Sequence, residues 1–289
     1  KRFMNNTSFN LSGKIDSHIT EVLASLHRAA AALDIPLFVI GAFARDLLLE
    51  HCYNIKPARK TSDLDLGVKV ADWDDYERLI GCLSREENCS RDPKNAQRIY
   101  LRSVPVDIVP FGQISDDQHN IFWPPERAFR MSVMGFQEAY DSSISIMLCE
   151  APELSIKIPT LPGLALLKII SWNERFPERG KDALDLLFIM DNYSETGIEN
   201  RLYQEESLLN DEKFDLKNAS IRLLGKDMAM LATSETYDTV KAILKNETDK
   251  EGLNRLANSM LSIKTDYDNQ LKTIMLKLAK LRQGFIYER

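Results

Sequence analysis

An apolar segment that ends in a glycine, followed by a segment of alternating apolar and acidic residues, most constrains the fold of this chain. Residues 37–40 read Leu-Phe-Val-Ile and end at Gly41, which predicts a short buried strand and a turn. Residues 42–50 return to a helical pattern. Residues 62–70 alternate with period two, which predicts a second strand. The sequence therefore predicts a strand, a glycine turn, a helix and another strand in succession.

Two aspartates project from one face of the second predicted strand. Side chains at positions i and i+2 of a strand lie on the same side, so Asp63 and Asp65 project together while Leu64 faces the core. Two carboxylates this close repel each other unless a positive charge lies between them. Mg²⁺ supplies such a charge and prefers oxygen ligands. Taken alone, the pair is better explained by a solvated strand face, and the preceding glycine turn is what favours a metal site.

A third aspartate, Asp107, lies in the apolar segment 104–110, which also reads as a strand. A carboxylate in such a segment costs free energy to bury without compensation. A metal is one compensation, and a third carboxylate completes the ligand set when two metals are used. A solvent-facing edge position or a salt bridge to an arginine explains Asp107 as well.

The turn at Gly41 and Ala42 has the composition of a phosphate-binding turn. The first backbone N–H groups of a helix have no partner within the helix, so they can hold a triphosphate. Small residues let a phosphate approach the backbone closely. A Gly-Ala turn by itself is weak evidence, but one that precedes an Asp-x-Asp strand is much more specific.

The chain changes character near residue 157, which predicts two domains. Before that point strand and helix patterns alternate, and after it nearly every pattern is helical. We predict a mixed α/β domain at residues 1–156 and a helical domain at 157–289. The expected helices cover residues 15–33, 42–50, 72–83, 164–172, 181–190 and 266–284. The expected strands cover 37–40, 62–70, 97–102, 104–109 and 131–149, with 143–148 the clearest part of the last. We expect a loose lead-in at 1–13, a loop at 84–95 and irregular chain at 112–130.

The bulk composition argues against several functions. A net charge of −6 and a pI of about 5.4 do not indicate general nucleic-acid binding, although local basic patches at residues 59–60 and 175–181 remain candidates. No apolar run reaches roughly eighteen residues, so we expect no membrane span. The four cysteines form no metal-ligand or CxxC pattern, which indicates reduced thiols in a cytoplasmic protein. The first residue is Lys1, so we expect the native start to lie upstream of it, and no secretory pattern follows that lysine.

Together these motifs resemble the signature of the DNA-polymerase-β-like nucleotidyltransferase superfamily. That signature is a Gly-Ser, Gly-Gly or Gly-Ala turn, a helix and an Asp-x-Asp strand, matched here by Gly41-Ala42 and by residues 61–66. With Arg45-Asp46 and the basic-x-Thr-x-Asp-x-Asp run, the chain is most similar to the AbiEii/AbiGii family of type IV toxin–antitoxin nucleotidyltransferases. A lysine on a helix and a downstream basic Asp-x-x-Asp helix follow in the same order, so the resemblance covers roughly residues 35–190.

The resemblance implies an enzyme that transfers a nucleoside monophosphate from a nucleoside triphosphate to an acceptor with the help of Mg²⁺. The family usually has Ser or Gly where this chain has Ala42, which removes a hydroxyl contact to phosphate. The spacing from the arginine to the first aspartate leaves room for a loop at residues 51–60. The implied roles are Mg²⁺ binding and catalysis for Asp63, Asp65 and Asp107, contact with the β- and γ-phosphates for Gly41 and Ala42, nucleotide binding for Arg45, contact with the triphosphate for Lys168, and action near the acceptor for Asp182.

The residues of the predicted helical domain also have simpler explanations. Lys168 can bury its aliphatic stem and expose its amine. Asp182 can stabilise a helix start, and Asp185 can pair with a surface cation. The upstream motif favours a functional role for Lys168. It favours neither a functional nor a structural role for Asp182, and for Asp185 the structural role is the better explanation.

The acceptor is the least constrained part of the hypothesis. The resemblance implies RNA, such as tRNA, or a protein side chain as the acceptor, and a cognate antitoxin as a partner. The segment from Gly41 through residues 45–49 also resembles the heads of CCA-adding enzymes and poly(A) polymerases, which carry a larger nucleic-acid-binding tail. A small-molecule adenylyltransferase of the aminoglycoside type is another candidate. A catalytically silent nucleotide-binding fold is the last one, and the three intact aspartates argue against it.

Overall fold

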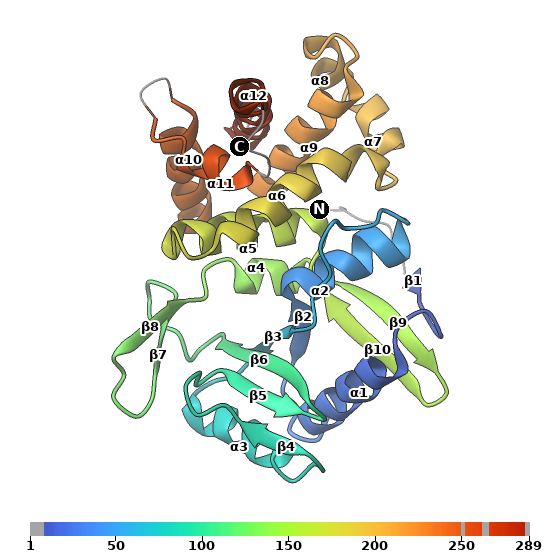
Figure 1. The fold of residues 1–289 in the computed structure, drawn as a ribbon, viewed down its shortest axis with the longest axis vertical. Coiled ribbons are helices and arrows are strands. Elements are labelled where there is room, and N and C mark those ends of the chain that lie inside the picture. The colour runs from blue at the N-terminus through green and yellow to red at the C-terminus, as the bar shows by residue number, and fades with distance from the viewer. Residues whose placement is uncertain (1–8, 250–251, 262–265, 287–289) are drawn as a thin grey trace. The chain divides into compact units, whose positions relative to one another are not determined.

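The computed structural model describes residues 9–249, 252–261 and 266–286 and divides the chain into two compact units, residues 1–160 and 161–289. Strands and helices mix in the first unit, and the described part of the second unit is helical (Figure 1). This arrangement confirms the predicted mixed α/β region followed by a helical region. The division falls at residue 160, against the predicted 156, because the last strand of the first unit continues to Ile158.

A five-stranded sheet of order β2-β3-β6-β5-β4 forms the centre of the first unit. Strands β3 and β6 are parallel and every other neighbouring pair is antiparallel, so the sheet is mixed. The register aligns one residue from each of four neighbouring strands in a row across the sheet, namely Ile40, Asp65, Asp107 and Arg98. The strands are β2 (Leu37–Ile40), β3 (Leu64–Lys69), β4 (Cys89–Arg91), β5 (Arg98–Leu101) and β6 (Val104–Phe111).

Further elements of the first unit surround this sheet. A second sheet joins three strands, and a two-stranded hairpin stands apart from both sheets (Figure 1). The elements are β1 (Phe9–Asn10), β9 (Ile144–Glu150) and β10 (Glu153–Ile158) in the second sheet; β7 (Asn120–Trp123) and β8 (Phe129–Ser132) in the hairpin; and α1 (Ser17–Ala31), α2 (Gly41–Asp46), a π-helical continuation (Leu47–Cys52), α3 (Trp73–Leu83) and α4 (Phe136–Asp141).

Several stretches differ from the sequence prediction. The predicted loop at 84–95 contains β4, and the predicted irregular stretch at 112–130 contains β7 and the start of β8. These strands are three or four residues long, too short for an alternating pattern to stand out. The strand prediction for 131–149 is wrong at residues 136–141, which form helix α4 because its aromatic residues pack on the sheet. The clearest part of that prediction, 143–148, corresponds to β9. The predicted lead-in contains β1 at its end, and its residues 1–8 lie outside the described residues.

The core of the first unit depends on a close approach between Phe38 and Gly67. These residues are paired across β2 and β3, and a Cβ on Gly67 would lie 2.2 Å from a carbon of the Phe38 ring. The ring is fully buried and packs edge-on against Phe111, Phe136 and Tyr140 at centroid distances of 5.4, 6.3 and 5.5 Å. Gly67 in β3, which has no side chain, therefore leaves the space that the Phe38 ring occupies in the aromatic core.

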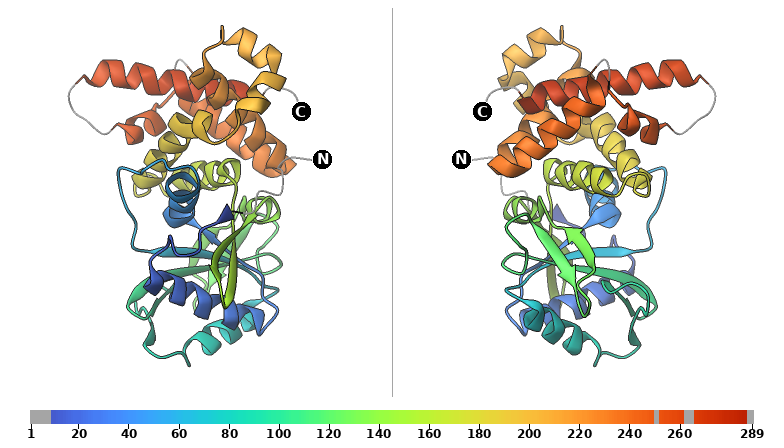
Figure 2. Two further views of the ribbon diagram at one scale, coloured as in Figure 1. Left: turned by 90° about the vertical axis from the view of Figure 1, so that its right-hand side faces the viewer. Right: turned by 90° about the vertical axis from the view of Figure 1, so that its left-hand side faces the viewer.

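The second unit is built from helices that pack closely. Helix α5 is buried almost all round, which explains its nearly continuous apolar sequence. Helices α9 and α12 pack against each other (Figure 2). Their close approach falls at Gly225 and Gly284, because a Cβ on Gly284 would lie 1.8 Å from the Arg222 carbonyl oxygen and one on Gly225 would lie 2.2 Å from the Leu281 carbonyl oxygen. The helices are α5 (Leu161–Glu174), α6 (Gly180–Asn192), α7 (Glu199–Gln204), α8 (Glu206–Asp211), α9 (Leu216–Leu231), α10 (Ser234–Thr248), α11 (Arg255–Met260) and α12 (Tyr267–Ile286), with a 3₁₀ turn at Tyr193–Glu195.

In the part of the chain that the structure describes, no helix combines the length and the apolar character needed to cross a membrane.

Substitution of Gly67 by alanine tests the aromatic core. The added methyl group has no space beside Phe38, so Gly67→Ala should lower the free energy of unfolding by about 1–3 kcal/mol in urea denaturation. Gly81→Ala is the matched control, because a Cβ on Gly81 in α3 meets no atom within 4 Å. That control should raise stability by about 0.5–1 kcal/mol. Equal stabilities of the Gly67 variant and the native chain would contradict the packing described here.

Candidate functional site

The three predicted metal ligands gather at one place on the five-stranded sheet. Asp65 in β3 and Asp107 in β6 are direct partners in the parallel register. Asp63 immediately precedes β3, two residues before Asp65. The guanidinium of Arg98 lies between two of the carboxylates, with Nη2 2.9 Å from Asp107 Oδ2 and 3.5 Å from Asp63 Oδ2. The structure therefore brings together acids that lie far apart in the sequence.

Arg98 is the residue of this site that the sequence analysis does not name. Its Nε donates to Asp107 Oδ1 at 2.6 Å and its Nη2 donates to Asp107 Oδ2, so the contact uses both carboxylate oxygens. The hydrogen bonds and the charge of Asp107 raise the pKa of Arg98, against the opposing effect of partial burial. The salt bridge to an arginine, one of the explanations open for Asp107, is thus present.

A sequence signal for this contact exists in the hairpin that joins β5 to β6. The register pairs Leu101 with Val104, which leaves a two-residue turn at Arg102 and Ser103. Both turn residues have positive φ, 51° and 68°, as the commonest two-residue hairpin turns require. Once that turn is recognised, counting back along both strands places position 98 opposite Asp107.

The absence of a side chain at Gly41 leaves room for the Asp65 carboxylate. Gly41 has φ of +73°, a conformation that residues with a side chain rarely adopt. A Cβ on Gly41 would lie 2.0 Å from Asp65 Oδ2. The Asp65 carboxylate therefore lies against the backbone at the start of α2, where Ala42 follows with a buried side chain. The turn predicted to contact phosphate thus adjoins the carboxylates, while the contact itself stays a prediction.

Arg45, predicted to bind nucleotide, lies in α2 and is buried, with 2% of its surface exposed. Its Nε donates to Asp46 Oδ1 at 2.7 Å, and its Nη2 donates to the carbonyl oxygen of Arg59 at 3.2 Å. The second contact holds the loop at residues 51–60 against helix α2. These contacts support a structural role for Arg45, and direct nucleotide binding by its side chain stays a prediction.

The carboxylate oxygens of the three aspartates are suitable ligands for a hard divalent cation, although an arginine now lies between two of these carboxylates. Asp63, Asp65 and Asp107 offer only carboxylate oxygens, which Mg²⁺ prefers. Within residues 9–249, 252–261 and 266–286, no group of three or more His, Cys, Asp or Glu side chains is placed so that it could hold a metal ion. The guanidinium of Arg98, between Asp63 and Asp107, keeps those carboxylates around itself.

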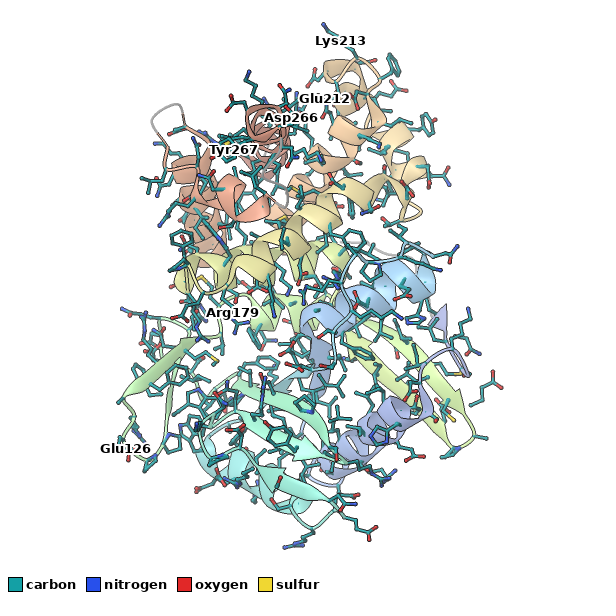
Figure 3. All side chains as sticks on the ribbon, viewed as in Figure 1. Glu126, Arg179, Glu212, Lys213, Asp266 and Tyr267 are labelled. Atoms are coloured by element: carbon teal, nitrogen blue, oxygen red, sulfur yellow. The ribbon has the colours of Figure 1, made fainter. Side chains whose placement is uncertain are left out.

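Lys168 and Asp182 form a separate buried cluster within the helical unit. Lys168 Nζ lies 2.7 Å from Asp182 Oδ1 and 2.7 Å from Asp185 Oδ2. Burial alone would lower the pKa of Lys168, but the two carboxylates outweigh burial and raise that pKa. The Ser171 hydroxyl donates to Asp182 Oδ2 at 2.9 Å, and Arg179, just before α6 (Figure 3), approaches the same oxygen at 3.8 Å.

These contacts bear on the roles expected for the helical residues. The Lys168 amine is enclosed, with a side chain only 9% exposed, so it does not reach solvent as a snorkelling lysine would. Asp185 is 1% exposed and pairs with that lysine, so it is not a surface ion-pair partner. The cluster joins α5 to α6. The expected contacts of Lys168 with triphosphate and of Asp182 with an acceptor stay predictions.

Comparison with known proteins gives distant matches only. No family model and no curated protein matches the sequence. One similar solved structure is the antibiotic-resistance factor ANT(2″)-Ia in solution (13% identity, 69% of this chain and 98% of that chain covered, TM-score 0.36). Another is ANT(2″)-Ia with adenylyl-2″-tobramycin (11% identity, 74% of this chain and 97% of that chain covered, TM-score 0.38). A CCA-adding enzyme with ATP also matches (14% identity, 90% of this chain and 66% of that chain covered, TM-score 0.33). Because these identities and TM-scores are low, a function for this chain has to be inferred from its own residues.

Alanine at position 41 tests the contact between the turn and Asp65. Gly13 offers a matched control, because its φ of +75° is nearly the same and a Cβ there meets no atom within 4 Å. Gly13→Ala should therefore cost only the backbone strain, about 1–2 kcal/mol in the free energy of unfolding. Gly41→Ala should cost clearly more, because the new methyl group also displaces the Asp65 carboxylate. Equal losses in urea denaturation would show that this carboxylate does not lie against Gly41.

Proposed function

We propose that this chain is a Mg²⁺-dependent nucleotidyltransferase that moves a nucleoside monophosphate from a nucleoside triphosphate to a hydroxyl group of an acceptor. The observation that carries the proposal is the gathering of Asp63, Asp65 and Asp107 next to the Gly41 turn. Carboxylates repel a triphosphate. A site that combines three carboxylates with a phosphate-binding turn is therefore suited to a triphosphate when divalent cations lie between the carboxylates and the phosphates.

Each residue of the first unit would have a defined task. Asp63, Asp65 and Asp107 would hold Mg²⁺. Mg²⁺ bound there would neutralise charge on the triphosphate and lower the pKa of the attacking hydroxyl. The backbone of Gly41 and Ala42 would contact the β- and γ-phosphates, since neither residue has a side chain large enough to keep a phosphate away.

The reaction would be an in-line displacement at the α-phosphorus. The acceptor hydroxyl gives up its proton to water as its oxygen forms a bond to that phosphorus, the bond to the bridging oxygen of the β-phosphate breaks, and pyrophosphate leaves. Most of the catalysis would come from positioning and charge neutralisation, as in phosphoryl transfer generally. Lys168 and Asp182 are proposed to contact the triphosphate and the acceptor. Both roles require their mutual ion pair to open, so holding α5 to α6 is the competing role for these residues.

The acceptor is proposed from the family resemblance. It implies RNA, such as tRNA, or a side chain of a protein, in a toxin whose partner is a cognate antitoxin. A small molecule of the aminoglycoside type is the alternative. One similar structure was solved with adenylyl-2″-tobramycin and another, the Thermotoga maritima CCA-adding enzyme, with tRNA, so both acceptor classes belong in the test.

Incorporation of labelled nucleotide tests this proposal directly. The purified chain is incubated with Mg²⁺, each nucleoside triphosphate labelled at its α-phosphate in turn, and either total RNA or tobramycin. Asp65→Asn, which removes one carboxylate charge, should lower the rate of transfer by about a hundredfold or more. Asp117→Asn, an exposed aspartate of the same unit, should leave the rate unchanged.

The acceptor that becomes labelled identifies the reaction. Label in RNA that is lost in Asp65→Asn supports a nucleic-acid acceptor, label on the chain itself supports self-modification, and label on tobramycin supports the small-molecule alternative. Nucleotide binding without transfer to any acceptor would favour a silent binding fold. Transfer at the native rate by Asp65→Asn would refute the proposed site.

A further inference from the structure

Arg98 holds two carboxylates that the proposed function needs as cation ligands. Both oxygens of Asp107 accept hydrogen bonds from its guanidinium, and the same guanidinium lies 3.5 Å from Asp63. The contact is partly screened from water, since the Arg98 side chain is 25% exposed and the Asp107 side chain 16% exposed. Hydrogen bonds of this charge-assisted, two-point kind are among the stronger ones in proteins.

The position of Arg98 follows from the sheet and cannot change without breaking it. Arg98 is the first residue of β5 and pairs with Asp107 across the hairpin. On the far side of β5, the backbone N–H of Asp92, just after β4, donates to the Arg98 carbonyl oxygen at 2.9 Å, so the backbone of Arg98 is held from both sides. Only the side chain is able to leave Asp107, by rotation about its own bonds toward the solvent to which it is already partly exposed.

A divalent cation and the Arg98 guanidinium compete for the same oxygens. The carboxylates of Asp63, Asp65 and Asp107 lie near one another and repel, and Arg98 places a positive charge beside two of them, Asp63 and Asp107. A cation bound to Asp107 would repel the guanidinium and would take over oxygen atoms that now accept its hydrogen bonds. Occupancy of the site by a metal therefore requires that Arg98 release at least part of its contact.

We propose that Arg98 is an internal counterion that occupies the carboxylate site when no metal is bound and yields it when a divalent cation binds. It keeps Asp63 and Asp107 together in the metal-free protein. It also raises the cation concentration at which the site fills, because each binding event first breaks the arginine contact. The inference rests on the proposed function only in taking these aspartates as cation ligands.

The test measures Mn²⁺ binding and stability rather than activity. Arg98→Gln keeps a side chain of similar polarity without the positive charge. Free Mn²⁺ is followed by electron paramagnetic resonance, and the Tm is recorded in EDTA and in saturating Mn²⁺. Arg91→Gln on the adjacent strand β4 is the matched control, since Arg91 pairs with Glu77 and both side chains are about half exposed.

Arg98→Gln should bind Mn²⁺ about tenfold more tightly than the native chain, the effect of removing a charge-assisted contact that the metal otherwise has to break. Its Tm in EDTA should fall, because the carboxylates lose their counterion, and saturating Mn²⁺ should restore most of the loss. Arg91→Gln should change neither quantity. Unchanged or weaker Mn²⁺ binding by Arg98→Gln would overturn the inference.

The same data separate this inference from the proposed function. Mn²⁺ binding by the native chain that Asp65→Asn abolishes, with unchanged affinity in Arg98→Gln, overturns the counterion role and leaves the cation site standing. Tighter binding by Arg98→Gln with no nucleotide transfer to any acceptor supports the counterion role while the proposed function fails. Absence of Mn²⁺ binding in both the native chain and Arg98→Gln overturns both.

Discussion

The parallel pairing of Asp65 with Asp107 is the constraint on which the rest of the first unit depends. It places two like charges on neighbouring strands, an arrangement that costs free energy unless cations or hydrogen-bond donors lie close by. The adjoining strands supply what the pair needs. Gly41, after β2, leaves space for the Asp65 carboxylate, and Arg98 on β5 donates to both oxygens of Asp107. The sheet order β2-β3-β6-β5 is therefore also the order in which the site is assembled.

The charged clusters of the two units differ in how their charges are compensated and in how far they are exposed to water. In the helical unit, Asp182 and Asp185 face two cations, the enclosed Lys168 and Arg179, whose guanidinium lies 3.8 Å from Asp182, so the charges of that cluster balance. In the first unit, Asp63 and Asp107 share the guanidinium of Arg98, and the Asp63 side chain is 43% exposed. A cluster that keeps an excess of negative charge and stays open to water is suited to a cation from solution, whereas a balanced, enclosed cluster is suited to holding helices together.

The sequence predicted the parts of this site that lie within one local pattern. The strand at residues 37–40, the glycine turn, the alternation around Asp65 and the helical second region all follow from periodicity over a few residues, and the structure has them. The Arg98 contact depends on strand register, which a two-residue turn sets and which periodicity alone does not reveal. Helix α4 and hairpin β7–β8 were missed because they are short and owe their form to tertiary packing. The pairing of Lys168 with Asp185 joins two helices, and no spacing within one helix encodes it.

The central claim is that the acids beside the Gly41 turn form a cation and triphosphate site. A crystal structure with Mn²⁺ and a non-hydrolysable nucleoside triphosphate tests it most directly, because anomalous scattering locates the metal. We expect Mn²⁺ in contact with Asp63, Asp65 and Asp107, the β- and γ-phosphates against the backbone of Gly41 and Ala42, and Arg98 turned away from at least one oxygen of Asp107. Mn²⁺ and triphosphate bound elsewhere, with Arg98 still donating to both oxygens, would contradict it.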